Sequence, residues 1–252
     1  MGERRVLVLG HSGTEGFGLD SRSSAWPERL ERRLIEGGVA ARVIGVPLFP
    51  VGSRAVDYVL GKVEQIDPEV VVLSLNAYPC AVPVVSARIR RRLGNRAHKA
   101  FVRMERRLSR AAGGEAGTVR DRTHSAVRRM AHAVVGSEPL ASLGEVAEVY
   151  TTIMRQLARR EGFQLIALSE APFSRKVRRE FHRSFSMAME LQRRLEPVIR
   201  EHHFVTVVPA GFDDGGPDDY WTSDGVHLSA AGNLAYADSL FEPVRDALAA
   251  GG

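Results

Sequence analysis

Short apolar runs rich in β-branched residues alternate with longer amphipathic stretches along most of this 252-residue chain. The runs have the length and composition of strands buried on both faces. They are Arg5–Leu9, Ala41–Val46, Val70–Leu75, Phe163–Leu168 and His203–Val208. The amphipathic stretches are Trp26–Glu36, Val56–Ile66, Val146–Arg160, Lys176–Arg200 and Ser229–Leu248. Strands that alternate with helices predict a parallel central sheet covered by helices on both faces, a three-layer α/β/α sandwich.

Residues 77–144 interrupt this alternation, because they contain no convincing strand. An Arg-rich helical stretch, Val84–Arg110, is followed by a Gly-rich break, Ala111–Gly117, and by a second helical piece near Val119–Val135. We interpret residues 77–144 as a basic helical insertion after the third strand. The whole chain, residues 1–252, is then expected to be a single domain that carries this insertion.

The sequence also bears on the cellular compartment. Cys80 is the one cysteine, which excludes an internal disulfide and fits a reducing environment. The apolar run Val6–Leu9 is too short for the core of a signal peptide. No apolar stretch approaches the roughly 20 residues that span a bilayer. We therefore expect a cytoplasmic protein without a membrane span.

Two motifs at opposite ends of the chain contain the groups that serine acyl chemistry requires. Ser12 follows the first predicted strand, and Asp224 and His227 form an Asp-x-x-His motif before the last predicted helix. A serine hydroxyl is a weak nucleophile, so a histidine must accept its proton and a carboxylate must orient that histidine. Gly52 and Asn76 also follow predicted strands. Ligands of parallel sheets bind at the carboxyl ends of the strands, so these residues are expected to share one edge.

These motifs resemble the SGNH, or GDSL-like, hydrolase family, a flavodoxin-like three-layer fold of esterases, thioesterases and acyltransferases. The Gly-Asp-Ser of its first block is matched by Gly10-His11-Ser12, and the Asp-x-x-His of its fifth block by Asp224-Gly225-Val226-His227. Its third block, Gly-x-Asn-Asp, is matched only at Asn76. The resemblance covers the sheet scaffold and the order of the blocks, but not the insertion.

The resemblance implies a role for each matched residue. Ser12 would be the nucleophile, His227 the general base, and Asp224 the carboxylate that orients His227. The reaction would be attack on an ester or thioester, with an acyl-Ser12 intermediate that passes to water or to another acceptor. It needs no cofactor and no metal.

The resemblance also implies an oxyanion hole, the set of donors that stabilises the negative oxygen of the tetrahedral intermediate. Its donors would be the backbone N–H groups of Ser12 and Gly52 and the side-chain amide of Asn76. The second block of the family supplies a glycine after the second strand, and its match here is loose. We choose Gly52 over Gly45 because Gly52 is expected to lie beyond the end of that strand.

Three residues depart from the family pattern. His11 stands where the family has Asp, and Ser74 and Ala77 replace the Gly and Asp of the third block. His11 is therefore a candidate contact for substrate, or a competitor for the proton of Ser12. Two other functions stay open: an acyltransferase that uses the same acyl-Ser12, and a non-catalytic binding protein that has retained the fold.

The positive charge of the chain is concentrated in the insertion. Residues 86–130 contain 14 Lys and Arg against 3 Asp and Glu, whereas the remainder of the chain has a net charge of −6. A solvated helix surface is the simplest interpretation. The alternatives are a docking surface for an acidic acyl carrier protein or coenzyme A, and a nucleic-acid site, which the single aromatic residue Phe101 makes unlikely. The candidate partner or substrate contacts there are Arg91, Arg92, Arg106 and Arg107.

Overall fold

The computed structural model describes residues 3–111, 137–170, 173–212 and 216–251. It contains two compact units. The larger unit is formed by Met1–Ala81 together with Leu143–Gly252, and the smaller unit by Val82–Ser142. The smaller unit falls within the predicted insertion, residues 77–144. The short helix α3 (Tyr78–Ala81), which opens that range, belongs to the larger unit.

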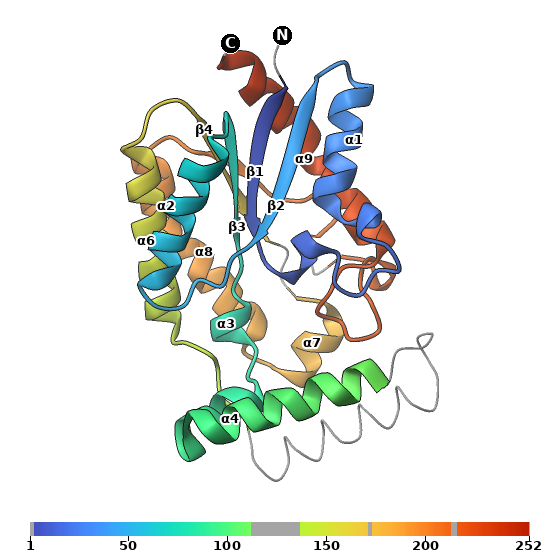
Figure 1. Ribbon diagram of the computed structural model, residues 1–252, viewed down its shortest axis with the longest axis vertical. Helices are drawn as coiled ribbons and strands as arrows, with labels where there is room; N and C mark the ends of the chain where they lie inside the picture. The colour runs from blue at the N-terminus through green and yellow to red at the C-terminus, as the bar shows by residue number, and fades with distance from the viewer. Residues whose placement is uncertain (1–2, 112–136, 171–172, 213–215, 252) are drawn as a thin grey trace. The chain divides into compact units, whose positions relative to one another are not determined.

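A five-stranded parallel sheet forms the centre of the larger unit (Figure 1). Its strands are β1 (Arg4–Gly10), β2 (Ala41–Pro47), β3 (Val70–Leu75), β4 (Gln164–Ser169) and β5 (Val205–Val207). Their order in the sheet is β2-β1-β3-β4-β5. The chain moves outward from β1 to β2 on one side and from β3 to β5 on the other. The topological switch point, where ligands of such sheets bind, therefore lies between β1 and β3.

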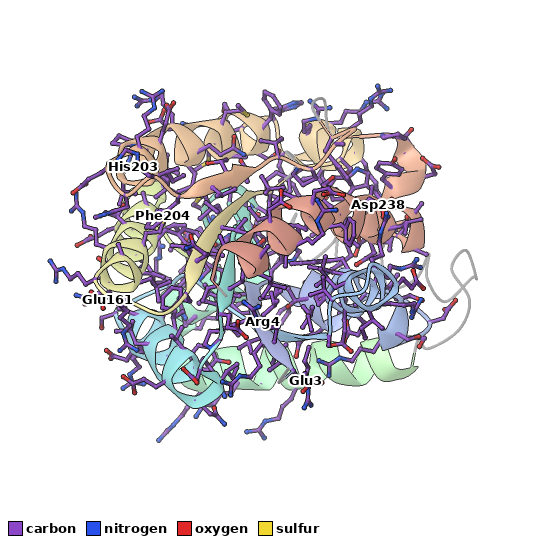
Figure 2. The ribbon with its side chains drawn as sticks, turned by 90° about the horizontal axis from the view of Figure 1, so that it is seen from above. Glu3, Arg4, Glu161, His203, Phe204 and Asp238 are labelled. Carbon is purple, nitrogen blue, oxygen red and sulfur yellow. The ribbon has the colours of Figure 1, made fainter. Side chains whose placement is uncertain are left out.

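Helices cover both faces of this sheet (Figures 1 and 2). One face is covered by α1 (Trp26–Glu36) and α9 (Ala230–Ala250), which pack against each other. The other is covered by α2 (Arg54–Ile66), α6 (Leu143–Ala158) and α8 (Ser184–Glu201). The predicted three-layer sandwich is confirmed. None of the described helices is long and apolar enough to cross a membrane.

The core follows from the two-residue period of the strands. Alternate residues of β1, β3 and β4 share one hydrophobic cluster with α1 and α9, because successive side chains of a strand point to opposite faces. The strand members of this cluster include Val6, Val8, Val70, Val72, Ile166 and Leu168. Every residue of β3 is buried, which explains why its sequence is almost entirely apolar. Figure 2 shows the sheet from the amino ends of its strands, where Arg4 and His203 are labelled.

One predicted helix is interrupted. The stretch Lys176–Arg200 forms two helices, α7 (Arg175–Glu180) and α8. The chain leaves the helical conformation at Phe181, where φ is −125° and ψ is 82°. The N–H of Phe181 closes α7 by donating to the carbonyl of Val177 at 2.7 Å. The prediction of one continuous helix was therefore wrong.

The smaller unit contains the basic helix α4 (Val85–Ala111). Its backbone is non-helical at Gly94, with φ 78° and ψ 179°, so the stretch predicted as one helix is interrupted there. Val84 and Glu138 exchange two backbone hydrogen bonds at the base of this unit. The predicted helical piece near Val119–Val135 lies outside the described residues.

Candidate active site

Ser12 lies in a tight turn after β1, an interior strand of the sheet. The turn is a 3-10 helix, η1 (Ser12–Glu15), and His11 is its N-cap. Thr14 closes it by donating to the carbonyl of His11 from its N–H at 2.9 Å and from Oγ1 at 2.7 Å. A Cβ at Gly10 would clash with Cγ2 of Thr14, so only glycine fits at the strand end. The turn therefore presents Ser12 at the carboxyl edge of the sheet.

Asp224 organises the loop that carries His227. One carboxylate oxygen, Oδ1, accepts the N–H of Val226 at 2.8 Å, the N–H of His227 at 3.0 Å and the hydroxyl of Thr222 at 2.8 Å. Gly225 lies in the same loop with φ 73°, a left-handed conformation that favours glycine. These contacts leave the second oxygen, Oδ2, free to meet the imidazole ring of His227.

Asn233 ties this loop to the start of α1. It is 1% exposed, and its NH2 group donates to the carbonyls of Leu228 at 3.1 Å and Ser229 at 2.9 Å. Its side-chain oxygen accepts the N–H of Trp26 at 3.0 Å. Trp26 begins the helix that follows the Ser12 turn. Sequence analysis did not anticipate Asn233, which brings the two ends of the chain together.

The three residues proposed for acyl chemistry form one hydrogen-bonded chain. Nε2 of His227 lies 2.9 Å from Oγ of Ser12, and Nδ1 lies 2.6 Å from Oδ2 of Asp224. Burial alone would raise the pKa of Asp224. The hydrogen bond and charge of His227 and the N–H groups of His227 and Val226 outweigh that effect and hold the pKa well below its ordinary value. The carboxylate is therefore ionised at neutral pH.

Asn76 lies at the end of β3, beside the switch point. It is 7% exposed, and its backbone N–H donates to the hydroxyl of Tyr150 at 2.9 Å. That hydroxyl donates in turn to the carbonyl of Ser74 at 3.0 Å. The side-chain oxygen of Asn76 accepts the N–H of Tyr78 at 2.7 Å. The NH2 group is thus left as a donor, and it forms no hydrogen bond with any described residue.

Neither candidate glycine lines the cavity that contains Ser12. Gly52 lies in an exposed turn with φ 75°, and no atom lies within 4 Å of the position of a Cβ there. Gly45 is inside β2, where it pairs with Val8. Ser12 and Asn76 both line the cavity. The assignment of Gly52 as an oxyanion donor stays a prediction.

A carboxylate that sequence analysis missed, Glu170, also lies at this edge. It follows β4 directly, and its Oε1 is 3.1 Å from Nε2 of His11. Nδ1 of His11 accepts the N–H of Gly13 at 3.2 Å and lies 3.4 Å from Oγ of Ser12. The rule that selected Ser12 and Asn76, a polar residue after a buried strand, also selects Glu170.

A small, largely apolar cavity opens at these groups. Its volume is about 170 Å³, and aromatic side chains form much of its wall. The aromatic and apolar side chains that line it include Phe49, Tyr78, Phe173, Trp221, Leu228 and Tyr236. The polar groups in it are those of Ser12, His227, Asn76, His11 and Glu170. Within the described ranges, no group of three or more His, Cys, Asp and Glu could hold a metal ion.

The four candidate arginines belong to the smaller unit. Nε of Arg91 lies 3.1 Å from Oε2 of Glu138, and Arg92 is exposed. The side chains of Arg106 and Arg107 lie outside the described residues. Partner docking at these arginines stays a prediction.

The whole chain is similar in structure to several solved esterases and acylhydrolases. TesA superposes with a TM-score of 0.57 at 15% identity, over 96% of this chain and 99% of that one. A lipase/acylhydrolase from Enterococcus faecalis superposes with a TM-score of 0.58 at 14% identity, over 96% of both chains. The M. smegmatis aryl esterase superposes with a TM-score of 0.58 at 12% identity, over 97% of this chain and 99% of that one.

The sequence itself matches no protein-family model and no curated protein. The structural likeness extends over nearly the full length of each neighbour, and it includes the parallel sheet with helices on both faces. The resemblance first noted in a few short motifs is thereby confirmed at the level of the fold. This chain has the fold of the SGNH hydrolases.

Proposed function

We propose that this protein is a serine hydrolase that cleaves carboxylic esters or thioesters through an acyl-Ser12 intermediate. The observation that carries this proposal is the hydrogen-bonded chain from Asp224 through His227 to Ser12. A carboxylate, an imidazole and a hydroxyl in this order form the arrangement that converts serine into a nucleophile. The esterase neighbours support it, since they share the fold.

In the acylation step, Oγ of Ser12 attacks the carbonyl carbon while Nε2 of His227 accepts the hydroxyl proton. Asp224 stabilises the resulting imidazolium through Nδ1, 2.6 Å away. The tetrahedral intermediate then collapses, and His227 gives its proton to the leaving oxygen or sulfur. In deacylation, His227 accepts a proton from water, whose oxygen attacks the acyl carbon. The second tetrahedral intermediate then collapses to the carboxylic acid, and His227 returns the proton to Oγ of Ser12.

The negative oxygen of each tetrahedral intermediate requires donors that are already in place. We assign this role to the N–H of Ser12 and the NH2 group of Asn76, whose side-chain oxygen is fixed by Tyr78. Gly52 is the predicted third donor. Each donor of this kind contributes about 3 kcal/mol of transition-state stabilisation. The buried position of Asn76 favours this role, because its amide cannot turn away without losing that hydrogen bond.

The size of the cavity favours a substrate with a small acyl group. Its volume of about 170 Å³ is below the roughly 300–1,000 Å³ of sites that enclose drug-sized ligands. Its aromatic wall favours an apolar acyl chain. Phe17 is 62% exposed, and the centroid of its ring lies 4.5 Å from the centroid of the His227 ring. Phe49 is 55% exposed. These two rings offer an apolar surface to the leaving group.

A fluorophosphonate probe tests the proposal, because it reacts with activated serines. We expect labelling of the wild-type protein at Ser12, none in Ser12→Ala, and strongly reduced labelling in His227→Ala. Ser186→Ala and His182→Ala are the matched controls, since both side chains are exposed. Labelling unchanged in Ser12→Ala, or absent from folded wild-type protein between pH 5 and pH 9, would refute the proposal and favour a binding protein. Product analysis with alcohol acceptors then separates hydrolysis from acyl transfer.

A further inference from the structure

Ser12 faces two imidazole rings rather than one. Nε2 of His227 lies 2.9 Å from its Oγ, and Nδ1 of His11 lies 3.4 Å from the same atom. In each ring, the nitrogen that does not face Ser12 contacts a carboxylate oxygen. Nδ1 of His227 lies 2.6 Å from Oδ2 of Asp224, and Nε2 of His11 lies 3.1 Å from Oε1 of Glu170. A carboxylate–imidazole pair therefore lies on each side of the nucleophile, whereas the proposed mechanism uses only one.

The hydrogen bonds around His11 determine its tautomer. Nδ1 accepts the N–H of Gly13 at 3.2 Å, so this nitrogen carries a lone pair and no proton. The ring proton is then on Nε2, where it is donated to Oε1 of Glu170. In this neutral form the ring caps η1, since the side chain of an N-cap residue satisfies a free N–H in the first turn. The same turn carries Ser12.

Glu170 is itself held in place. Its Oε1 accepts the hydroxyl of Ser74, which is 2% exposed, and its carbonyl accepts Nε2 of Gln192 at 3.2 Å. Two departures from the family pattern, His11 in the first block and Ser74 in the third, thus converge on one carboxylate. A negative charge that the family has beside its serine is supplied here from the end of a different strand, β4.

We propose that His11 is a positioning residue for Ser12, that Glu170, itself held by Ser74, orients its ring, and that Ser12 reacts only while His11 is neutral. This inference rests on the proposed function. A proton added to Nδ1 would face the N–H of Gly13, so the N-cap hydrogen bond is lost. The new N–H of His11 donates instead to Oγ of Ser12. This hydrogen bond occupies the lone pair of Oγ that would attack the carbonyl carbon of the substrate.

The charges around His11 set the pH at which this change occurs. Burial lowers the pKa of His11, but the charge and hydrogen bond of Glu170 outweigh burial and raise it above its ordinary value. Other titratable groups of this site are His227 with Asp224 beyond Ser12, Tyr78 in the cavity wall, and Tyr150 of α6. Burial and the charge of Glu170 raise the pKa of Tyr150 well above its ordinary value, so Tyr150 stays neutral.

The decisive variant is Glu170→Gln, which keeps an oxygen acceptor for His11 and Ser74 but removes the charge. Burial then acts against a hydrogen bond alone and no longer against a negative charge, so the pKa of His11 falls. We expect the acid limb of the pH–rate profile for fluorophosphonate labelling of Ser12 to move to lower pH. A residue that only stabilises the fold would change the rate without moving the limb. Glu148→Gln on α6 is the matched control, because this exposed side chain makes no hydrogen bond or ion pair with described residues.

Substitutions of His11 separate its two effects. His11→Ala should slow labelling by roughly fivefold to tenfold at pH values where the His11 ring of the wild type is neutral, the equivalent of a lost N-cap hydrogen bond. His11→Asn restores an acceptor for Gly13 but cannot be protonated, so it should recover most of that loss and lack the acid limb that protonation of His11 causes. NMR titration of the His11 ring provides the pKa directly in wild type and Glu170→Gln.

The outcomes distinguish this inference from the proposed function. If Ser12 of Glu170→Gln is labelled, but the acid limb of its labelling rate and the titration of His11 stay at the wild-type pH, the inference is overturned and the proposed function remains intact. The same holds if His11→Asn keeps the wild-type acid limb. Wild-type protein that is folded by circular dichroism but not labelled at any pH overturns both.

Discussion

Asp224→Asn is the substitution whose effect the geometry determines most closely. Oδ1 of Asp224 accepts three donors from its own loop, so the side-chain oxygen of Asn takes this position and the loop is preserved. The NH2 group then replaces Oδ2, which lies 2.6 Å from Nδ1 of His227. Two donors cannot face each other at that distance. The ring must therefore move its proton to Nε2, the atom that faces Ser12.

With a proton on Nε2, His227 cannot accept the proton of Ser12. The wrong tautomer in such a triad lowers the rate by about 10⁴-fold, or about 5.5 kcal/mol of transition-state stabilisation. We expect a loss of this size in the fluorophosphonate rate at pH 7.5. Nitrogen chemical shifts of the ring should show the Nε2–H tautomer.

The control for this prediction is Asp219→Asn. Asp219 is exposed in the same segment, and its contact with Ser229 involves only its backbone carbonyl. This variant should label at the wild-type rate. An Asp224→Asn protein that is folded and labels within tenfold of wild type would show that Asp224 does not set the tautomer of His227, and the reasoning above would be wrong.

Two further predictions concern stability, measured as the free energy of unfolding in urea. Tyr150→Phe removes the buried hydroxyl that bonds the N–H of Asn76 and the carbonyl of Ser74, and should lower the free energy of unfolding by about 2 kcal/mol. An unchanged free energy of unfolding would show that these hydrogen bonds do not stabilise the fold. Gly225→Ala should lower it by about 2 kcal/mol, because φ is 73° and a Cβ would lie 2.6 Å from Oγ of Ser174. Gly38→Ala has a similar φ of 81° without any close atom, so an equal loss there would exclude the clash as a cause.

The strands and two of the polar residues at their ends were predictable because both depend on local patterns. Val70–Leu75 was predicted with the bounds that the structure has, since a fully buried parallel strand is a continuous apolar run. Ser12 and Asn76 then fall at the switch point, because Ser12 lies two residues after the end of β1 and Asn76 directly follows β3.

Features that depend on long-range contacts were not predictable in this way. Glu170 was missed because the fourth strand was predicted to end at Leu168, one residue before its observed end at Ser169. Its partner His11 lies far away in sequence, and no local pattern connects them. The break at Phe181 carries neither Gly nor Pro, so helical periodicity alone could not reveal it. Asn233 resembled an ordinary helix residue until its contact with Trp26 was known.

The distance in sequence between the proposed nucleophile, Ser12, and its proposed base, His227, has a consequence for biosynthesis. Ser12 leaves the ribosome early, whereas His227 is added 215 residues later. At about 5 to 20 residues per second, this interval lasts about 10 to 40 s. During that time β1 lacks α9, which completes its packed face and holds the His227 loop. The nascent chain therefore carries an inert serine, and we expect acyl chemistry to begin only when the last helix has docked.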